Sequence, residues 1–206
     1  MLNRIDTIVM DIGNVLAQYR WKDYLRSFSF SEETFQKLSE AIFLSPAWAE
    51  FDRGAKSDEE ILQMICKNAP KLRKEISMVL SPKWKDLVWE YDFSEQWVKE
   101  LKGKGYRVLV LSNYGETLFG LAKENFRFLK WIDGGVISYE VKHIKPEREI
   151  FDALIQKYHV VPEQSVFLDD LPANTEAAAR LGFHTVTVTS HEAAVEGLAQ
   201  LLGDMV

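Results

Sequence analysis

Four polar clusters along the chain combine carboxylate, amine, hydroxyl and amide groups. The first contains Asp11, which follows three apolar residues in the run IVMDIGNVL and precedes Gly13 and Asn14. An apolar run that ends at turn-forming residues is typical of a buried parallel strand leading into a loop. An aspartate at that point can cap a turn, or it can act as a nucleophile towards a ligand bound beside the strand end.

The other three clusters stand in a similar position relative to an apolar stretch or a helix start. They are Ser112 and Asn113 in VLVLSNYG, Lys145 in HIKPE, and Asp169 and Asp170 with Asn174 in VFLDDLPAN. Each has an ordinary explanation: Ser and Asn cap helices, a single lysine is usually solvated, and adjacent acids often form a surface turn. Four such clusters at one edge of one sheet are difficult to explain as unrelated turns, so we expect them to meet.

Together the clusters provide three carboxylates, a lysine, a hydroxyl and an amide. Converging carboxylates repel one another unless a cation joins them, and an oxygen-rich site with one or two protein carboxylates and a phosphate is typical of Mg²⁺. A lysine and a hydroxyl can hold the remaining phosphate oxygens, and an aspartate facing a phosphate can attack it covalently. The residue types therefore favour Mg²⁺ as cofactor and a phosphorylated ligand.

The elements that must position these groups alternate between strands and helices. Strands are predicted over residues 5–10, 107–111, 135–138, 165–168 and 185–188, and helices over 95–102, 116–125, 146–158, 173–181 and 191–202. This alternation predicts an α/β fold, a Rossmann-like parallel sheet with helices on both faces. Ligands bind beyond the carboxyl ends of the strands in such sheets, which is where the clusters would lie.

Between the first two strands the pattern changes to helical periodicity. Helices are predicted over residues 21–27, 32–41, 58–68, 71–80 and 83–90, with no strand among them. Ser57 followed by Glu60 forms a capping box at one of these starts. We therefore expect a core of residues 1–16 and 94–206 and an inserted α-helical cap of residues 17–93, lying over the end of the first strand.

Composition limits the remaining possibilities. The 206 residues are 47% hydrophobic and 27% charged, which suits one globular domain or one with an insertion. The net charge is −6 and the charges are dispersed, so we expect no nucleic-acid partner. No apolar run reaches the length of a membrane span, no secretory signal is evident, and Cys66 is the only cysteine, so we expect a cytoplasmic protein without membrane contact.

The four clusters resemble, in the same order, the four signature motifs of the haloacid dehalogenase superfamily of phosphohydrolases. The likeness is carried by DIGNVL, by LSN, by the KP at Lys145 and Pro146, and by FLDDLPANTEAAARLGF. The superfamily also has a helical cap between its first two motifs. WAEFDRGAKSDEE within the cap is most similar to the bacterial subgroup that includes an alpha-D-glucose-1-phosphate phosphatase.

The resemblance implies which residues handle the phosphate. Asp11 would be the nucleophile that forms an aspartyl phosphate. Ser112 and the amide of Asn113 would bind the phosphate. Lys145 would offset negative charge on both the nucleophile and the phosphate.

The resemblance also implies a metal site. Asp11, the carbonyl of Gly13 and Asp170 would bind Mg²⁺. Asp169 would act through a bound water or orient Lys145, and Asn174 would support the ligands from behind.

At position 13 the chain departs from the family pattern. Most phosphatases of the superfamily carry a second aspartate two residues after the nucleophile, and this chain has Gly13. What is lost is the usual general acid, and such catalysis typically contributes ~10²- to 10⁴-fold. Three explanations stay open: a leaving group that needs no enzyme acid, a proton from a cap residue or His143, or a protein that binds its ligand with little turnover. The glucose-1-phosphatase-like subgroup also has glycine there, which favours an active enzyme.

The cap is expected to choose the substrate. A lid over the site excludes water and large ligands, which indicates a small metabolite, with sugar phosphates as the leading class. Arg53 and Gly54, in the segment 48–56, are candidates for a specificity loop. Trp21 and Trp48 are candidates for the wall of a sugar site, although aromatic residues also pack a cap's own core.

These observations lead us to expect an enzyme, a Mg²⁺-dependent phosphatase of a small phosphorylated substrate. A phosphosugar mutase and a non-catalytic phospholigand-binding protein on the same scaffold are the alternatives. A dehalogenase uses the same aspartate on a carbon centre without a metal, so the paired acids Asp169 and Asp170 argue against it.

Overall fold

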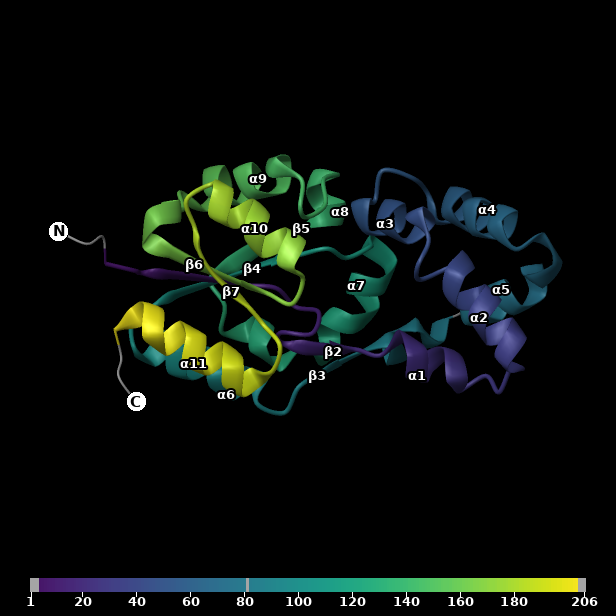
Figure 1. Cartoon of the computed structure of the whole chain (residues 1–206), viewed down its shortest axis with the longest axis horizontal. Coiled ribbons are helices and arrows are strands. Elements are labelled where there is room, and N and C mark those ends of the chain that lie inside the picture. The colour runs from purple at the N-terminus through teal and green to yellow at the C-terminus, as the bar shows by residue number, and fades with distance from the viewer. Residues whose placement is uncertain (1–3, 81, 204–206) are drawn as a thin grey trace.

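A five-stranded parallel sheet forms the centre of the molecule (Figure 1). The computed structural model describes residues 4–80 and 82–203. Every neighbouring pair in the sheet is parallel, and the order is β5 (Gly134–Ile137), β4 (Arg107–Ser112), β1 (Thr7–Met10), β6 (Ser165–Asp169) and β7 (His184–Thr187). The Rossmann-like sheet expected from the sequence is confirmed.

The central strand β1 is fully buried on both faces. Ile8 and Met10 pack into a hydrophobic cluster on one face, and Val9 packs into a second cluster on the other. Because successive side chains of a strand point to opposite faces, a strand covered on both sides needs a continuous apolar run. The run that leads into Asp11 therefore reflects this central position.

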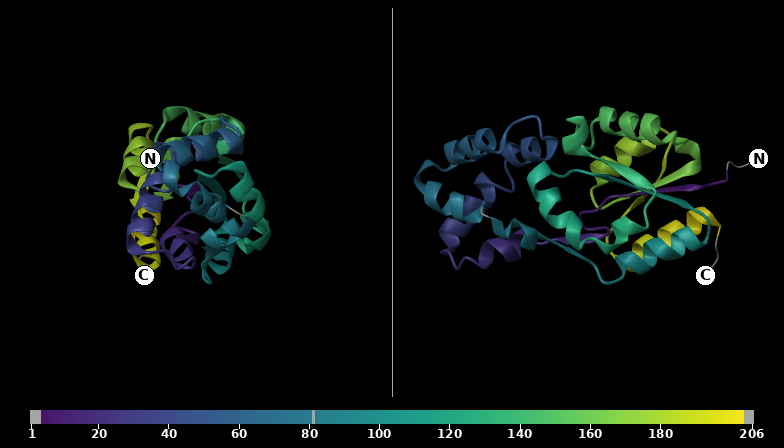
Figure 2. Two further views of the ribbon diagram at one scale, coloured as in Figure 1. Left: turned by 90° about the vertical axis from the view of Figure 1, so that its right-hand side faces the viewer. Right: turned by 180° about the vertical axis from the view of Figure 1, so that it is seen from behind.

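Two helical layers cover the sheet (Figure 2). Helices α9 and α10, with the short α8, supply the cluster around Val9, and helices α6, α7 and α11 supply the cluster around Ile8. Their bounds are α6 (Ser94–Gly103), α7 (Glu116–Ala122), α8 (Ser138–Val141), α9 (Arg148–Tyr158), α10 (Pro172–Arg180) and α11 (His191–Leu202). Short 3₁₀ segments in this part of the chain are Lys123–Asn125, Arg127–Lys130 and Pro162–Gln164.

The helices of the predicted cap gather at one end of the molecule, beyond the carboxyl edge of the sheet (Figure 1). They are α1 (Trp21–Arg26), α2 (Glu32–Ala41), α3 (Pro46–Arg53), α4 (Asp58–Asn68) and α5 (Arg73–Val79), with 3₁₀ segments at Pro70–Leu72 and Pro82–Leu87. The predicted capping box starts α4, where the Glu60 amide donates to Ser57 Oγ and the Ser57 amide donates to Glu60 Oε2.

A small antiparallel pair of strands at the base of the cap was not expected. Strand β2 (Ala17–Tyr19) pairs with β3 (Val88–Glu90), so the predicted helix over residues 83–90 is wrong. Strands of three residues are too short to show alternation, and their partners lie about 70 positions apart in the sequence, as Gln18 and Trp89 do. These strands connect core and cap, and the exact domain bounds at residues 17 and 93 stay a prediction.

Helix α3 also differs from the expectation, because it occupies most of the segment taken as a specificity loop. Pro46 stands in its first turn and Gly54 ends it in the left-handed conformation, with φ of 66°. Proline at the start and glycine just after the end are helix boundary signals, so this helix was readable from the sequence.

Among the described residues, no helix combines the length and the apolar character needed to span a membrane.

Gly135 in β5 is expected to tolerate no larger residue. A Cβ at this position would overlap Cγ2 and the carbonyl oxygen of Val110 on the neighbouring strand. Gly135→Ala should therefore lower the free energy of unfolding by about 1–3 kcal/mol. In Gly120→Ala the new Cβ meets no atom within 4 Å, so this helical substitution should raise it by about 0.5–1 kcal/mol. Urea unfolding of both variants tests this, and equal changes would contradict it.

Candidate active site

The polar clusters of the sequence meet at the carboxyl edge of the sheet. Asp11 comes directly after β1, while Ser112 and Asp169 are the last residues of β4 and β6. Asp11, Ser112 and Lys145 line a cavity of about 410 Å³ whose opposite wall comes from the cap. The structure thus brings together the groups that were expected to converge.

Lys145 is the centre of this arrangement. Its Nζ lies 2.9 Å from Oδ1 of Asp11 and 2.6 Å from Oδ2 of Asp169, and the residue is only 3% exposed. Burial acts to lower the pKa of the amine, but the charges and hydrogen bonds of the two aspartates outweigh it and raise the pKa overall. Lys145 is therefore a fixed cation beneath the cavity.

The backbone of Lys145 is held by Asn113. The Asn113 side-chain amide donates to the carbonyl of Lys145 at 3.0 Å, and the Lys145 amide donates to Oδ1 of Asn113 at 2.8 Å. The side chain of Asn113 thus fixes the loop that carries the lysine. We had expected an amide of Asn113 at the phosphate, and the structure shows its side-chain amide engaged with Lys145.

Asp169 is fixed through both carboxylate oxygens. Oδ2 accepts from Lys145, and Oδ1 accepts from Nδ2 of Asn174 and from the amide of Leu171, each at 2.9 Å. The residue is fully buried. Of the two roles expected for Asp169, this geometry favours the orientation of Lys145, and it places Asn174 behind the site.

Asp170 lies closer to the cavity. Its Oδ2 accepts from Nδ2 of Asn14 at 2.9 Å, and Asn14 adopts a positive φ of 54°, which asparagine tolerates better than most residues. Both Asp170 and Asn14 line the cavity with Gly13. In the sequence, Asn14 stands directly after Gly13 and indicates only a turn, so its contact with Asp170 is visible in the structure alone.

The three aspartates fit a divalent cation. Asp11, Asp169 and Asp170 each offer a carboxylate oxygen, and these atoms lie within 4.8 Å of one another. Burial, followed by the charge of Asp169, raises the pKa of Asp11 to about 6 although Lys145 opposes the shift, and burial also raises the pKa of Asp170. One lysine does not balance three carboxylates, and hard oxygen donors of this kind suit Mg²⁺.

The cap contributes an aromatic wall. Trp21, Phe43 and Trp48 line the cavity and also contact one another, with ring centroids 5.1 Å apart for Trp21 and Phe43 and 4.9 Å for Phe43 and Trp48. Tyr19 stacks on Trp48 at 6.2 Å. Trp21 and Trp48 therefore pack the cap and face the site at the same time.

Arg53 and Gly54 lie elsewhere than expected. The Arg53 guanidinium donates to both carboxylate oxygens of Glu147, at 2.7 and 2.6 Å, and the Gly54 carbonyl accepts from Nζ of Lys142 at 2.6 Å. Neither residue is among the described residues that line the cavity. In the structure both residues make contacts that join the cap to the core.

The cap residue that does face the cavity is Asp52, one position before Arg53. The sequence held a signal for it: once residues 46–53 are recognised as helical, Trp48 and Asp52 are four positions apart and share one face. Consecutive helical residues point about 100° apart, so Arg53 and Asp52 serve different surfaces.

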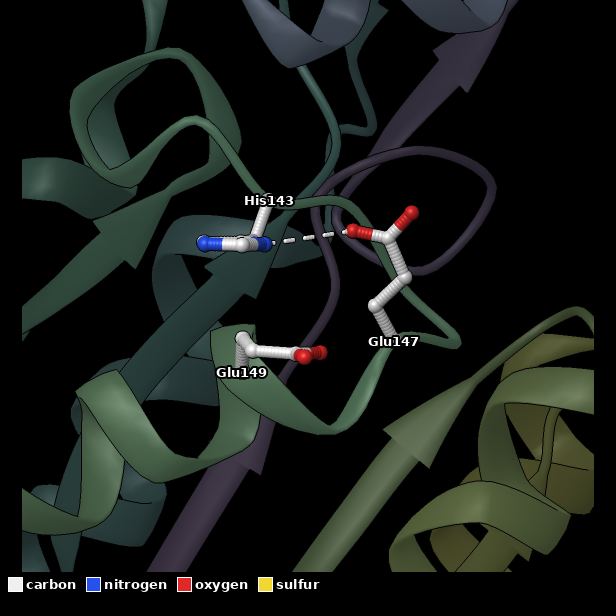
Figure 3. Close-up of side chains that lie close together, drawn as sticks. All are labelled: His143, Glu147 and Glu149. Atoms are coloured by element: carbon white, nitrogen blue, oxygen red, sulfur yellow. Dashed lines mark ion pairs between the residues drawn. The ribbon is translucent and has the colours of Figure 1, made fainter.

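A second cluster of possible metal ligands lies beside the Arg53 contact. Figure 3 shows His143 facing Glu147, at 3.4 Å between Nδ1 and Oε2, with Glu149 nearby. The Arg53 guanidinium and the Ile144 amide already donate to Glu147 and hold its pKa at about 2. His143 is not among the described residues that line the cavity.

The raised pKa of Asp11 makes a prediction for the metal-free protein. A folded pKa of about 6, against roughly 4 in an unfolded chain, means that ionised Asp11 opposes folding. The stability that protonated Asp11 provides is complete below about pH 4 and is lost as the pH rises through 6. Asp11→Asn should thus raise the free energy of unfolding by ~1–3 kcal/mol at pH 7.5 in a chelator, and this difference should shrink towards pH 4. A difference that does not change with pH would contradict the assignment.

Curated relatives resemble parts of this chain in sequence, and solved structures resemble it in fold. "Acyl-CoA dehydrogenase family member 10" of Mus musculus is 30% identical over 77% of this chain and 15% of the relative. "D-ribitol-5-phosphate phosphatase" of Bacteroides thetaiotaomicron is 34% identical over 40% of this chain and 43% of the relative. The match thus spans less than half the length of either relative.

Two crystal structures show the same fold. A HAD family enzyme of Bacteroides thetaiotaomicron, solved with magnesium and inorganic phosphate, superposes with a TM-score of 0.69 at 22% identity and covers 89% of this chain and 93% of its own. A dehalogenase solved as an intermediate complex gives a TM-score of 0.72 at 18% identity, covering 98% of this chain and 99% of its own. At these identities the likeness concerns the fold.

The family model of haloacid dehalogenase-like hydrolases matches residues 5–182, which include the four polar clusters and the intervening cap. This chain therefore belongs to the haloacid dehalogenase-like hydrolase family.

Proposed function

We propose that this hydrolase is a Mg²⁺-dependent phosphatase that releases phosphate from a small phosphorylated metabolite through an aspartyl phosphate on Asp11. The observation that supports this most directly is the pairing of Lys145 with Asp11 and Asp169 below the cavity, with Asp170 next to them. A carbon-centred dehalogenation needs no such set of carboxylates, whereas a phosphate and a divalent cation need them.

Asp11 is the proposed nucleophile because its orientation is fixed. Its Oδ1 accepts from the Ile12 amide at 2.7 Å and from Lys145, so the carboxylate cannot rotate freely. We assign the attack on phosphorus to Oδ2. Lys145 and Ser112, which line the same cavity, are placed to hold phosphate oxygens.

The proposed metal ligands are Asp11, Asp170 and the carbonyl of Gly13, all of which line the cavity. When bound, Mg²⁺ would neutralise charge shared between the nucleophile and the phosphate. Asp169 takes part indirectly, since its oxygens already hold Lys145, Asn174 and Leu171. This division of roles is consistent with magnesium and phosphate in the related crystal structure.

Sugar and polyol phosphates are the substrate class we favour. The cavity volume of about 410 Å³ suits a small metabolite, and the cap supplies aromatic faces from Trp21 and Trp48. One relative is named for a polyol phosphate, D-ribitol 5-phosphate. A phosphosugar mutase and a binding protein without turnover are the alternatives on this scaffold.

Turnover with several esters tests the proposed function. Wild-type protein with Mg²⁺ should release phosphate from p-nitrophenyl phosphate and from at least one of glucose 1-phosphate, glucose 6-phosphate and ribitol 5-phosphate. Asp11→Asn should reduce release to background because the nucleophile is gone, while circular dichroism shows an unchanged fold. Acid quenching followed by mass spectrometry should find a phosphate on the wild-type peptide that contains Asp11.

Each alternative gives a different result in this assay. A mutase would convert glucose 1-phosphate into glucose 6-phosphate without release, and a binding protein would show affinity without turnover. A dehalogenase would release chloride from 2-chloropropionate. Full activity in Asp11→Asn would contradict the assignment of the nucleophile.

The metal assignment predicts different effects for Asp170 and Asn174. Asp170→Ala removes a proposed ligand and should raise the Mg²⁺ concentration for half-maximal activity by more than ~100-fold. Asn174→Ala removes only a hydrogen bond to Asp169, and such supporting contacts cost ~10-fold or somewhat more. Calorimetric titration with Mg²⁺ gives a readout independent of turnover. Equal effects of the two substitutions would contradict the assignment.

A further inference from the structure

The catalytic edge of the core lacks a proton donor at the position where the family usually carries one. Position 13 is glycine, and a Cβ built there would meet no atom within 4 Å. An alkoxide is a poor leaving group, so an ester of an aliphatic alcohol needs an acid close to the bridging oxygen. The wall of the cavity that the cap provides carries a carboxyl group.

We propose that Asp52, in the last turn of α3, is the general acid that protonates the leaving group, in place of the aspartate absent at position 13. This inference rests on the proposed phosphatase function. Asp52 lines the same cavity as Asp11 and Lys145, but it comes from the cap. A substrate with its phosphate on the core would therefore have its leaving group on the side of Asp52.

The position of Asp52 is fixed against the core by its own backbone and its neighbours. Ser138 Oγ donates to the Asp52 carbonyl at 2.5 Å, and the next two residues make the contacts to Glu147 and Lys142 described above. Helix α3 packs against α8, which lies beside it in Figure 1. General acids need a defined place relative to the reacting oxygen, and these contacts provide it.

Packing on the other side of Asp52 supports the same conclusion. A Cβ at Gly115 would overlap the ring of Phe51, so the helix approaches the core loop as closely as a glycine allows. The main chain of Gly115 also acts on the Asp52 carboxyl group, where it lowers the pKa against the effect of burial. Asp52 therefore lies close to the loop that follows Ser112, and Ser112 is one of the proposed phosphate-binding residues.

Two phenol hydroxyls on the Asp52 side of the cavity could bind polar atoms of a ligand. Tyr19 and Tyr114 line it, and each has a buried hydroxyl without a hydrogen-bond partner among the residues that the structure describes. A buried polar group without a partner is costly, and such groups usually await a ligand or water. The charge of Asp52 acts on both phenols, which places the three groups near one another.

The surroundings also keep a proton available on Asp52. Burial first, and then the charge of Asp11, raise its pKa to about 7, against the effects of the Gly115 main chain and Lys145. The phenols of Tyr19 and Tyr114 are titratable groups whose pKa values are raised by burial and by the charge of Asp52. A carboxyl group with this pKa can give up a proton and regain it near neutral pH.

The proposed reaction has two balanced steps. Oδ2 of Asp11 forms a bond to phosphorus as the bond to the ester oxygen breaks, and that oxygen keeps the electron pair and takes the proton of Asp52. The alcohol leaves, and Asp52 is now a carboxylate. It then accepts a proton from a water molecule that attacks the aspartyl phosphate, which releases phosphate, regenerates the Asp11 carboxylate and restores protonated Asp52.

Asp52→Asn tests the proposal through the leaving group. The ratio kcat/KM covers the steps up to departure of the alcohol, so we compare it for p-nitrophenyl phosphate, which needs no acid, and for the best alkyl ester of the wild-type enzyme. The variant should lose ~10²- to 10⁴-fold with the alkyl ester and less than ~10-fold with the aryl ester. With the aryl ester it should also accumulate phosphate on Asp11, because the base of the second step is lost.

The control is Asp58→Asn, a matched substitution in the cap. Asp58 accepts a hydrogen bond from Thr117 across the cap and core contact and does not line the cavity. Asp58→Asn should change kcat/KM for both esters by the same small factor. In the Asp52→Asn background, Gly13→Asp should restore part of the alkyl ester activity, since a Cβ at position 13 would meet no atom within 4 Å.

An equal loss with both esters in Asp52→Asn, without accumulated phosphoenzyme, would overturn the role of Asp52. That outcome is distinct from failure of the proposed function, in which the wild-type enzyme itself would hydrolyse neither ester and form no phosphoenzyme.

Discussion

The site depends on the burial of one ammonium group between two carboxylates. Lys145 is almost fully enclosed, and a buried charge is stable only where partners and hydrogen bonds replace water. Asp11 and Asp169 are those partners, and Asn113 and Asn174 hold the backbone and the carboxylate in place. Because the lysine offsets only part of the aspartate charge, a bound cation would favour the binding of an anionic substrate at this edge. The same electrostatic imbalance therefore accounts for both the metal and the phosphate in the proposed function.

The core of this site was predictable because a parallel sheet converts local sequence patterns into a shared location. Asp11 and Asp169 each follow an apolar strand, and neighbouring parallel strands end at the same edge. No comparable strand pattern places Asp52 at the site, because its position at the cavity depends on how the inserted cap folds back over the core. The pairing of β2 with β3, which sets that placement, joins segments far apart in the sequence and too short to recognise singly. From the sequence we expect a specificity loop at Arg53 and Gly54, whereas residues 46–53 form a helix, in which one position changes the surface that a side chain reaches.

Cap and core are also joined by their hydrophobic packing. The cluster that contains Ile8 and Met10 from β1 continues through Leu118 of α7 to Phe51 and Trp84 at the base of the cap, whereas the cluster on the other face of the sheet stays within the core. Rings such as Trp48 serve both the packing of the cap and the wall of the cavity. Substitutions of these residues are thus expected to change both the shape of the cavity and the free energy of unfolding. The two properties therefore cannot vary independently.

The hydrogen bonds between residues 52–54 and the core link the position of the cap to the proposed reaction. With the proposed nucleophile on the sheet and the proposed acid on α3, the two halves of the proposed reaction belong to different parts of the molecule. A cap lifted from Ser138 and Glu147 would leave the core able to bind a phosphate but without a proton for the alcohol. The contacts that hold the cap against the core would then be required for catalysis. The ester bond would be cleaved only when the bound substrate allows the cap to make these contacts. Discrimination between alcohols would arise in the reaction step itself, and tight binding of the phosphate alone would not be enough to cleave the ester.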